Sequence, residues 1–151
     1  MDGGNLELRI ANDLEEVSRV IETVEEYCAD HGAPPKVVYQ LCLVIDEIVT
    51  NIVSYGFEDE GRHEIALRFR VEDGRIEGEI EDDGRPFDPL TEAKAPDLDA
   101  EIDDRPIGGL GVFFMKSFMD RVEYRRDGAL NRLSFAKSFV GGAGAPGGDG
   151  A

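Results

Sequence analysis

The stretch LCLVIDEIVTNIVSYGF, residues 41–57, contains the pattern on which the fold depends. Its apolar residues, with Val37 before it, recur at steps of three and four, which places them on one side of an α-helix. The members of this stripe are Val37, Leu41, Val44, Ile45, Ile48 and Ile52. The spacing predicts a long helix that is buried along one side, opened by Pro34-Pro35 and closed by Gly56.

Two polar side chains lie at the edge of this predicted stripe. Glu47 and Asn51 are four residues apart, so they share one side of the helix, one turn above the other. Beside a core, a carboxylate and a carboxamide cost free energy unless they find partners. Two oxygen-bearing side chains one turn apart suit a hard cation such as Mg²⁺ and can act on its water shell. A solvated polar edge of the helix is the alternative explanation of this pair.

The rest of the chain mixes helical and strand patterns. Apolar residues at helical spacing predict a helix that Asn12 or Asp13 caps and that runs to about His31, where Gly32 ends it. Period-two alternation predicts strands at residues 6–10, 64–71, 76–82, 121–126 and 131–139, with turn signals at 73–74 and 127–128. Because these strand patterns are one-sided, we expect a two-layer α/β sandwich (α+β), a mixed sheet with its helices on one face.

An acid, Asp82, falls at the end of the third predicted strand. It keeps the parity of Ile76 and Ile80, so it lies on the core-facing side. Such an acid is either a turn residue or a buried acceptor that needs a donor.

A long connection without a clear period, residues 90–107, follows this strand. Inside a compact domain such a connection is usually a functional lid or a disordered segment. Gly108-Gly109-Leu110-Gly111 and a short apolar helix at 112–119 come next. Glycines let backbone N–H groups approach a ligand, and a helix start adds a positive dipole end, although a plain turn is the commoner outcome of a glycine cluster.

Composition excludes several classes of function. A net charge of −17 argues against direct binding of nucleic acid, which needs clustered Lys and Arg, and against anionic membranes. No apolar run approaches the roughly 18 residues of a membrane span, and the first residues lack a secretory pattern, so we expect a cytoplasmic protein. Cys28 and Cys42 have apolar neighbours, which predicts buried, reduced thiols. We expect one domain, residues 1–140, and a disordered Gly-rich tail, 141–151.

Three motifs follow one another along the chain, and their order is more specific than any one of them alone. They are E-x-x-x-N on a helix, D-x-G-x-P-F-D after a strand, and G-G-L-G at the start of a helix after a long loop. They lie in DEIVTNIVSYGF (46–57), EDDGRPFDP (81–89) and RPIGGLGVFFMKSFMDRVEYRR (105–126). This resembles the Bergerat-fold (GHKL) ATPases, which implies a mostly antiparallel sheet. Among these the chain looks most like the short anti-sigma factor serine kinases of the RsbW and SpoIIAB type. The resemblance covers nearly the whole chain apart from the tail.

The resemblance implies a role for each matching residue. Asn51 matches the asparagine that binds Mg²⁺, and Glu47 matches the general base that acts on the attacking hydroxyl. Asp82 matches the aspartate that accepts a hydrogen bond from the adenine amino group of ATP. Gly84 matches the glycine that admits the base. The phosphate-side glycines behind the lid at 90–107 are matched by Gly109 and Gly111, with Gly108 and Leu110 beside them.

Two positions depart from the family pattern. Tyr55 stands where the family often has histidine, and Pro86 stands where the superfamily often has glycine. Both changes are compatible with nucleotide binding, but Tyr55 leaves open what that histidine does in the phosphate site.

The resemblance implies an ATP- and Mg²⁺-dependent serine/threonine protein kinase that binds a sigma factor. Its substrate would be a serine on a STAS-type anti-anti-sigma protein, and the family implies a homodimer. The alternative is an ATP-binding switch that sequesters a regulatory protein without significant kinase activity. A histidine-kinase catalytic piece and a domain without a ligand are weaker alternatives.

Overall fold

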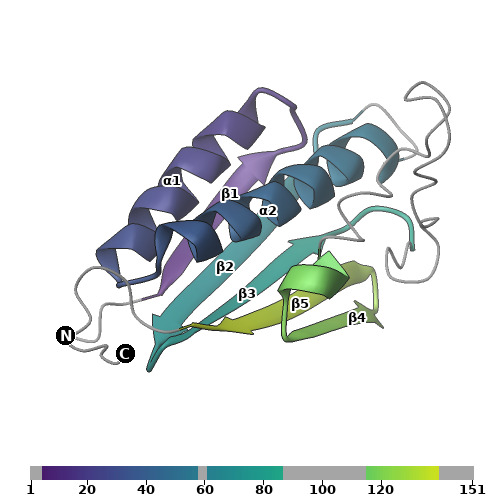
Figure 1. Cartoon of the computed structure of the whole chain (residues 1–151). Helices are drawn as coiled ribbons and strands as arrows, with labels where there is room; N and C mark the ends of the chain where they lie inside the picture. Colours follow the sequence, from purple (N-terminus) through teal and green to yellow (C-terminus); the bar gives the residue numbers. More distant parts are fainter. Residues whose placement is uncertain (1–4, 58–60, 87–114, 140–151) are drawn as a thin grey trace, which may run out of the picture.

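The computed structural model describes residues 5–57, 61–86 and 115–139 (Figure 1). Its strands are β1 (Leu6–Ala11), β2 (Glu64–Glu72), β3 (Arg75–Asp82), β4 (Arg121–Asp127) and β5 (Leu130–Ser138). Its long helices are α1 (Glu16–Asp30) and α2 (Pro35–Tyr55), and residues 115–118 form a helical turn before β4.

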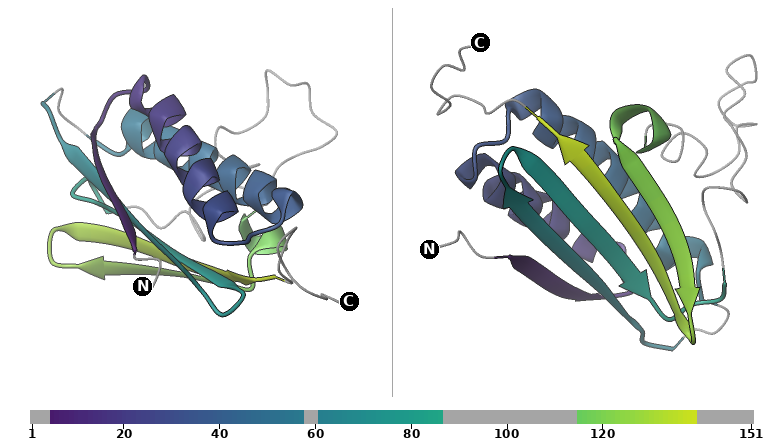
Figure 2. Two further views of the ribbon diagram at one scale, coloured as in Figure 1. Left: turned by 90° about the vertical axis from the view of Figure 1, so that its left-hand side faces the viewer. Right: turned by 90° about the horizontal axis from the view of Figure 1, so that it is seen from below.

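The five strands form one sheet in the order β1-β2-β3-β5-β4. Helices α1 and α2 lie side by side on one face of this sheet, so the two-layer sandwich is confirmed (Figures 1 and 2). Every pairing of the described strands is antiparallel, which agrees with the mostly antiparallel sheet that the family resemblance implies. Two hairpins, β2–β3 and β4–β5, account for half of these pairings. The pair of helices between β1 and β2 returns the chain to the end that β1 left, so these two strands are also antiparallel.

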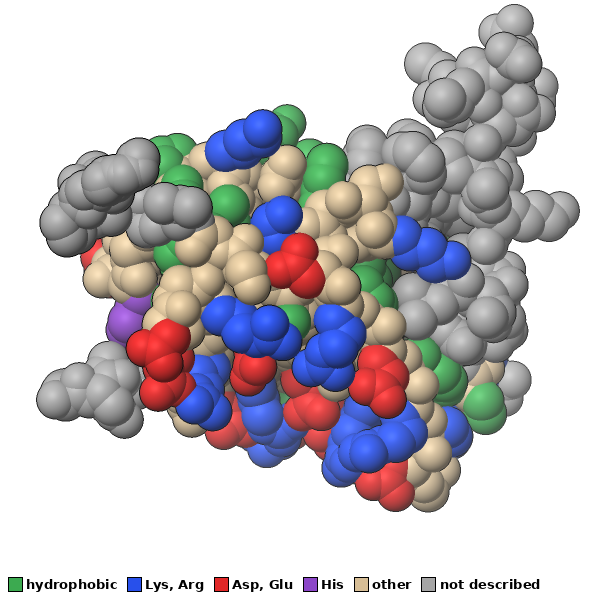
Figure 3. All heavy atoms as spheres, turned by 60° about the horizontal axis from the view of Figure 1, so that its bottom comes forward, with side chains coloured by type: hydrophobic (Ala, Val, Ile, Leu, Met, Phe, Trp, Pro, Cys, Tyr) green, Lys and Arg blue, Asp and Glu red, His purple; other side chains and the backbone are tan. Residues whose placement is uncertain are grey.

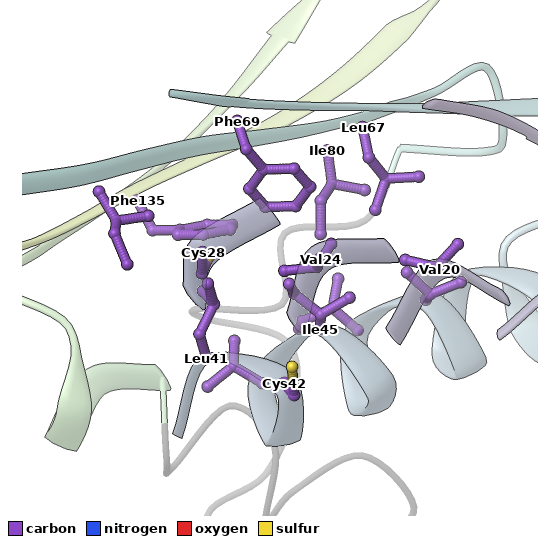
Figure 4. Close-up of a cluster of buried hydrophobic side chains, with 14 of the residues drawn as sticks. Val20, Val24, Cys28, Leu41, Cys42, Ile45, Leu67, Phe69, Ile80 and Phe135 are labelled. Atoms are coloured by element: carbon purple, nitrogen blue, oxygen red, sulfur yellow. The ribbon is translucent and has the colours of Figure 1, made fainter. Parts of the chain in front are cut away.

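The core lies between the sheet and the helices. Buried side chains from α1, α2, β2, β3 and β5 meet there, among them Val24, Leu41, Ile45, Phe69 and Phe135 (Figure 4). Gly78 is the packing partner of the two aromatic rings: a Cβ at this position would lie 2.5 Å from Cε1 of Phe135 and 3.0 Å from Cδ1 of Phe69. The buried thiols of Cys28 and Cys42 are confirmed, and burial raises the pKa of each to about 12.

Helix α2 is buried over a wider arc than the predicted stripe. Val38, Cys42 and Val49 are buried as well, while Val37 and Ile52 are only partly buried. The wider arc arises because side chains of α2 pack into the core with those of the sheet and of α1. By length and composition alone α2 could span a membrane, which the count of apolar runs did not indicate. In this fold its apolar residues form the core.

Helix α1 begins later than predicted. It starts at Glu16, after a turn in which the Asp13 carboxylate accepts a hydrogen bond from the Glu15 N–H group at 2.9 Å. The Asn12 side chain instead joins β1 to the start of β2: its Nδ2 donates to the Gly61 carbonyl, and its Oδ1 accepts from the His63 N–H group. Asn12 therefore connects the end of β1 to the segment before β2 and does not cap α1.

The face of the sheet away from the helices is charged. Six strand arginines make ion pairs there or at its edges with acids of the same or neighbouring strands: Arg9, Arg68, Arg70, Arg75, Arg121 and Arg132. Figure 3 shows basic and acidic side chains intermingled over this side of the molecule. A hollow of about 320 Å³ lies on it, lined in part by Arg68, Glu77 and Ser134.

Candidate functional site

Glu47 and Asn51 lie together on α2, as their spacing predicted. Asn51 Nδ2 donates a hydrogen bond of 3.3 Å to Glu47 Oε2. Both side chains are partly buried, because they flank the helix face that packs into the core. The pair is therefore oriented by a contact within the helix, and a fully solvated edge does not describe it.

The other end of the Asn51 amide lacks a partner in the described part of the chain. Its Oδ1 is buried and accepts no hydrogen bond there. A buried acceptor without a donor costs about 1–3 kcal/mol, so such an atom needs an explanation. A carboxamide oxygen beside a carboxylate is a ligand that Mg²⁺ prefers. The residues at this point of α2 thus fit the cation that the motif implies.

Asp82 ends β3 with its side chain turned inward, and only 5% of the residue is exposed. Its Oδ2 accepts hydrogen bonds from the Gly84 N–H group at 2.8 Å and from Asn131 Nδ2 at 3.2 Å. Burial raises the pKa of Asp82, and the hydrogen bonds from Gly84 and Asn131 oppose this rise. Both sequence interpretations of Asp82 hold: it is a turn residue for Gly84 and also a buried acceptor.

The turn after Asp82 is fastened to the end of α2. The Arg85 N–H group donates to the Gly56 carbonyl at 2.8 Å, and Arg85 Nε donates to the Tyr55 carbonyl at 3.0 Å. Gly84 is buried against the same place, where a Cβ would lie 2.2 Å from the Gly56 carbonyl oxygen. Asn51 precedes Tyr55 by one helical turn, about 6 Å along the axis. The fold thus brings the Asp82 turn to the end of the helix that carries Glu47 and Asn51.

Sequence analysis missed three residues of this site. Asn131 is buried in β5 directly opposite Asp82, and Tyr124 and Arg126 of β4 both donate hydrogen bonds to its Oδ1. Arg126 also donates to the Gly84 carbonyl at 2.9 Å. The available signal was parity: Asn131 shares its strand face with Leu133 and Phe135, so a polar residue there needs a partner.

The other predicted site residues divide into two groups. Pro86 is exposed at the end of the described turn, and the Tyr55 side chain is exposed at the end of α2. The lid at 90–107 and the predicted phosphate-side residues lie outside the described residues: Gly108, Gly109, Leu110 and Gly111.

Comparison with known proteins identifies the class of domain that this fold and site represent. A family model described as a histidine kinase-like ATPase domain matches residues 10–137, which include Glu47, Asn51 and the Asp82 turn. The chain therefore belongs to this family of ATPase domains.

Its relatives define the branch. The chain is 28% identical over 130 residues to the serine-protein kinase RsbW of Bacillus velezensis, covering 83% of this chain and 80% of that protein. It is 34% identical over 96 residues to the serine/threonine-protein kinase BtrW of Bordetella bronchiseptica, covering 64% and 67%. These relatives support the anti-sigma factor serine kinase branch that the motifs indicated.

A solved structure agrees on the fold. The RsbU and RsbW domains of a Mycobacterium tuberculosis protein match with a TM-score of 0.64 at 14% identity, over 89% of this chain. This chain spans 32% of that longer one, so the likeness concerns the fold of one of its parts.

Proposed function

We propose that this chain is an ATP-dependent serine/threonine protein kinase of the anti-sigma type. It would bind a sigma factor and phosphorylate a serine on a STAS-type anti-anti-sigma protein. The observation that carries the proposal is the buried, unpartnered Oδ1 of Asn51 beside the Glu47 carboxylate, within the described part of α2. The kinase names of the relatives support the same assignment.

Each residue of the site has a role in this proposal. Asp82 accepts a hydrogen bond from the adenine amino group, which orients the nucleotide at the sheet end of the site. Asn51 offers Oδ1 to Mg²⁺, which supplies neutralisation of phosphate charge when bound. Glu47 takes the proton of the acceptor hydroxyl as its oxygen attacks the γ-phosphorus and ADP departs. Such a base contributes roughly 10² to 10⁴ in rate.

The phosphate end of the site is proposed from the sequence alone. Residues 108–111 would cover the phosphates with backbone N–H groups, and residues 90–107 would act as the lid over them. We also propose a cytoplasmic homodimer, on the family resemblance.

The experiment separates chemistry from binding on α2. Glu47→Gln should lower phosphate transfer to a STAS-type protein by about 10² to 10⁴ while changing ATP affinity by less than about threefold, because the base makes no obligatory contact with ATP. Asn51→Ala should lower Mg-ATP affinity by at least about tenfold, since it removes a metal ligand. Calorimetry and transfer assays with labelled ATP measure the two effects.

Asp46→Asn is the matched control. Asp46 is the exposed acidic neighbour of Glu47, and its carboxylate holds the Thr50 hydroxyl at 3.2 Å. This variant should retain both affinity and transfer. Transfer at the parent rate by Glu47→Gln would exclude the proposed base. A parent that binds ATP but transfers no phosphate would favour the ATP-binding switch without kinase activity. Absence of ATP binding by the parent would exclude both candidates.

A further inference from the structure

Among the described residues, two polar side chains are buried, Asp82 and Asn131, and each is the other's partner. They lie directly opposite in the pairing of β3 with β5. Burying a carboxylate and a carboxamide together is costly unless their hydrogen bonds are complete.

The surroundings of Asn131 allow only one orientation of its amide. Arg126 Nη1 lies 3.1 Å from Oδ1, and a guanidinium can only donate, so the amide oxygen must face Arg126. The Tyr124 hydroxyl donates to the same oxygen at 2.5 Å. The NH₂ group is thereby directed at two acceptors, Asp82 Oδ2 at 3.2 Å and the Arg85 carbonyl at 2.9 Å.

This orientation determines what Asp82 can offer to a ligand. Its Oδ2 already accepts from the Gly84 N–H group and from Asn131, both of which donate only. Within the described residues, both hydrogen bonds to the Asp82 side chain go to Oδ2 and leave Oδ1 available. Two donors on Oδ2 favour the ionised form of Asp82, because they stabilise a carboxylate more than a neutral carboxyl. The ionised side chain then presents Oδ1 as an acceptor.

We propose that Asn131, oriented by Tyr124 and Arg126, is a positioning residue that keeps Asp82 an acceptor and thereby determines which purine the site selects. The proposal rests on the nucleotide-binding function proposed above. A purine with an amino group at position 6, as in ATP, offers Asp82 a donor. A purine with a carbonyl group there, as in ITP or GTP, places two acceptors against each other, and that arrangement is disfavoured.

Asn131→Asp tests this selection, because it replaces the donating NH₂ with an oxygen at nearly constant size. Two carboxylates this close share a proton, and because the variant no longer donates to Oδ2, that proton can reside on Oδ1 of Asp82, which then donates to the ligand. The charged groups that act on Asp82 from outside the pair are Asp83 and Arg126. The ratio of ATP affinity to ITP affinity, measured by calorimetry on the full chain at pH 7, should fall by at least about tenfold.

The pH profile distinguishes this role from a merely structural one. In Asn131→Asp the preference for ATP should recover as the pH rises and the shared proton leaves, while the ratio for the parent stays level over the same range. Tyr124→Phe removes only the hydroxyl that helps to orient Asn131. It should therefore also lower the ratio of ATP affinity to ITP affinity, by a smaller factor than Asn131→Asp. Ser134→Ala, on the opposite face of β5, should leave the ratio unchanged.

The outcomes separate the inference from the function beneath it. If the parent prefers ATP and both Asn131→Asp and Tyr124→Phe keep its ratio, Asn131 has no role in selection and the inference is wrong. If the parent binds neither ATP nor ITP, the proposed nucleotide-binding function fails, and the inference fails with it. Should Asn131→Asp not fold, as judged by circular dichroism, the ratio for Tyr124→Phe decides the question.

Discussion

At the scale of single residues, the burial of Asp82 has opposite consequences for folding and for ligand binding. Burial raises the pKa of this carboxyl above its ordinary 3.8, and the neighbouring Asp83 adds to the rise, while Gly84, Asn131 and Arg126 oppose it. The native state therefore binds the Asp82 proton more tightly than the unfolded state does. By linkage, the free energy of unfolding therefore falls as the pH rises through the native pKa of Asp82. It is regained when Asp82 is protonated at lower pH.

Ligand binding has the opposite sign. Only ionised Asp82 accepts a hydrogen bond from an adenine amino group, so ATP affinity should fall about tenfold per pH unit below the native pKa. Over the same window the parent should gain stability relative to Asp82→Asn, which has no carboxyl to titrate there. Calorimetry with ATP and urea unfolding, each repeated across the acid range, measure the two trends.

Asp82→Asn also serves as the control for ATP itself, because the nucleotide phosphates titrate equally with either protein. Its affinity should be low and should show only the titration of ATP. Parallel affinity profiles for the parent and Asp82→Asn would mean that Asp82 does not contact the base.

At the scale of elements, the site depends on how the end of β3 meets the end of α2. Gly84 is needed there for space: a Cβ would lie 2.2 Å from the Gly56 carbonyl oxygen and 2.8 Å from Asp82 Oδ2. The first of these atoms is backbone and cannot move aside without shifting α2 or the turn. Gly84→Ala should therefore cost about 1–3 kcal/mol of stability and weaken ATP binding by displacing Asp82.

Gly32→Ala is the matched control for this substitution. Gly32 joins α1 to α2 with a φ of +89°, and a Cβ there would meet nothing within 4 Å among the described residues. Its cost should be about 1–2 kcal/mol, from the left-handed backbone alone. Urea unfolding should show a loss of stability in both glycine variants, whereas only Gly84→Ala should lose ATP affinity. Equal ATP affinity in the two variants would show that the Asp82 turn tolerates displacement.

Helices and strands could be predicted from the sequence where the spacing of their apolar residues follows the face that is buried. The stripe in α2 and the alternation in β2 and β3 each report one buried face, and the Glu47–Asn51 spacing placed both side chains together. Periodicity describes each element separately, so it does not indicate that β5 lies between β3 and β4 in the sheet. Asn131 was missed for this reason: its importance comes from the strand opposite, and that pairing is a tertiary fact. The late start of α1 was missed because Asn12 bonds to residues about 50 positions away.

At the scale of the whole molecule, charge is unevenly organised. The chain has a net charge of −17, yet arginines and acids are intermingled on the helix-free face of the sheet (Figure 3). Arg68 lies at the centre of this arrangement. Its guanidinium contacts the carboxylates of Glu7, Glu79 and Glu81 at 3.5, 3.2 and 2.9 Å, from β1 and β3 on either side of its own strand. One cation on β2 thus separates three acids that belong to the two neighbouring strands.

Removing that cation takes away the shared partner of three carboxylates in a chain that is already strongly acidic, although Glu7 keeps Arg9 and Glu81 keeps Arg132. Arg68→Gln should therefore cost about 1 kcal/mol at low salt, at the upper end for exposed pairs because several charges form a network. Arg19→Gln is the control, since Arg19 contacts the single acid Glu16 on the surface of α1 at 2.8 Å and should cost less. Added salt screens the repulsion among the three acids, so the difference between the two variants should shrink from 20 to 500 mM NaCl. Thermal unfolding at both salt concentrations measures the difference in stability between the two variants. A difference that persists at 500 mM would show that Arg68 stabilises the sheet by packing its side chain rather than by its charge.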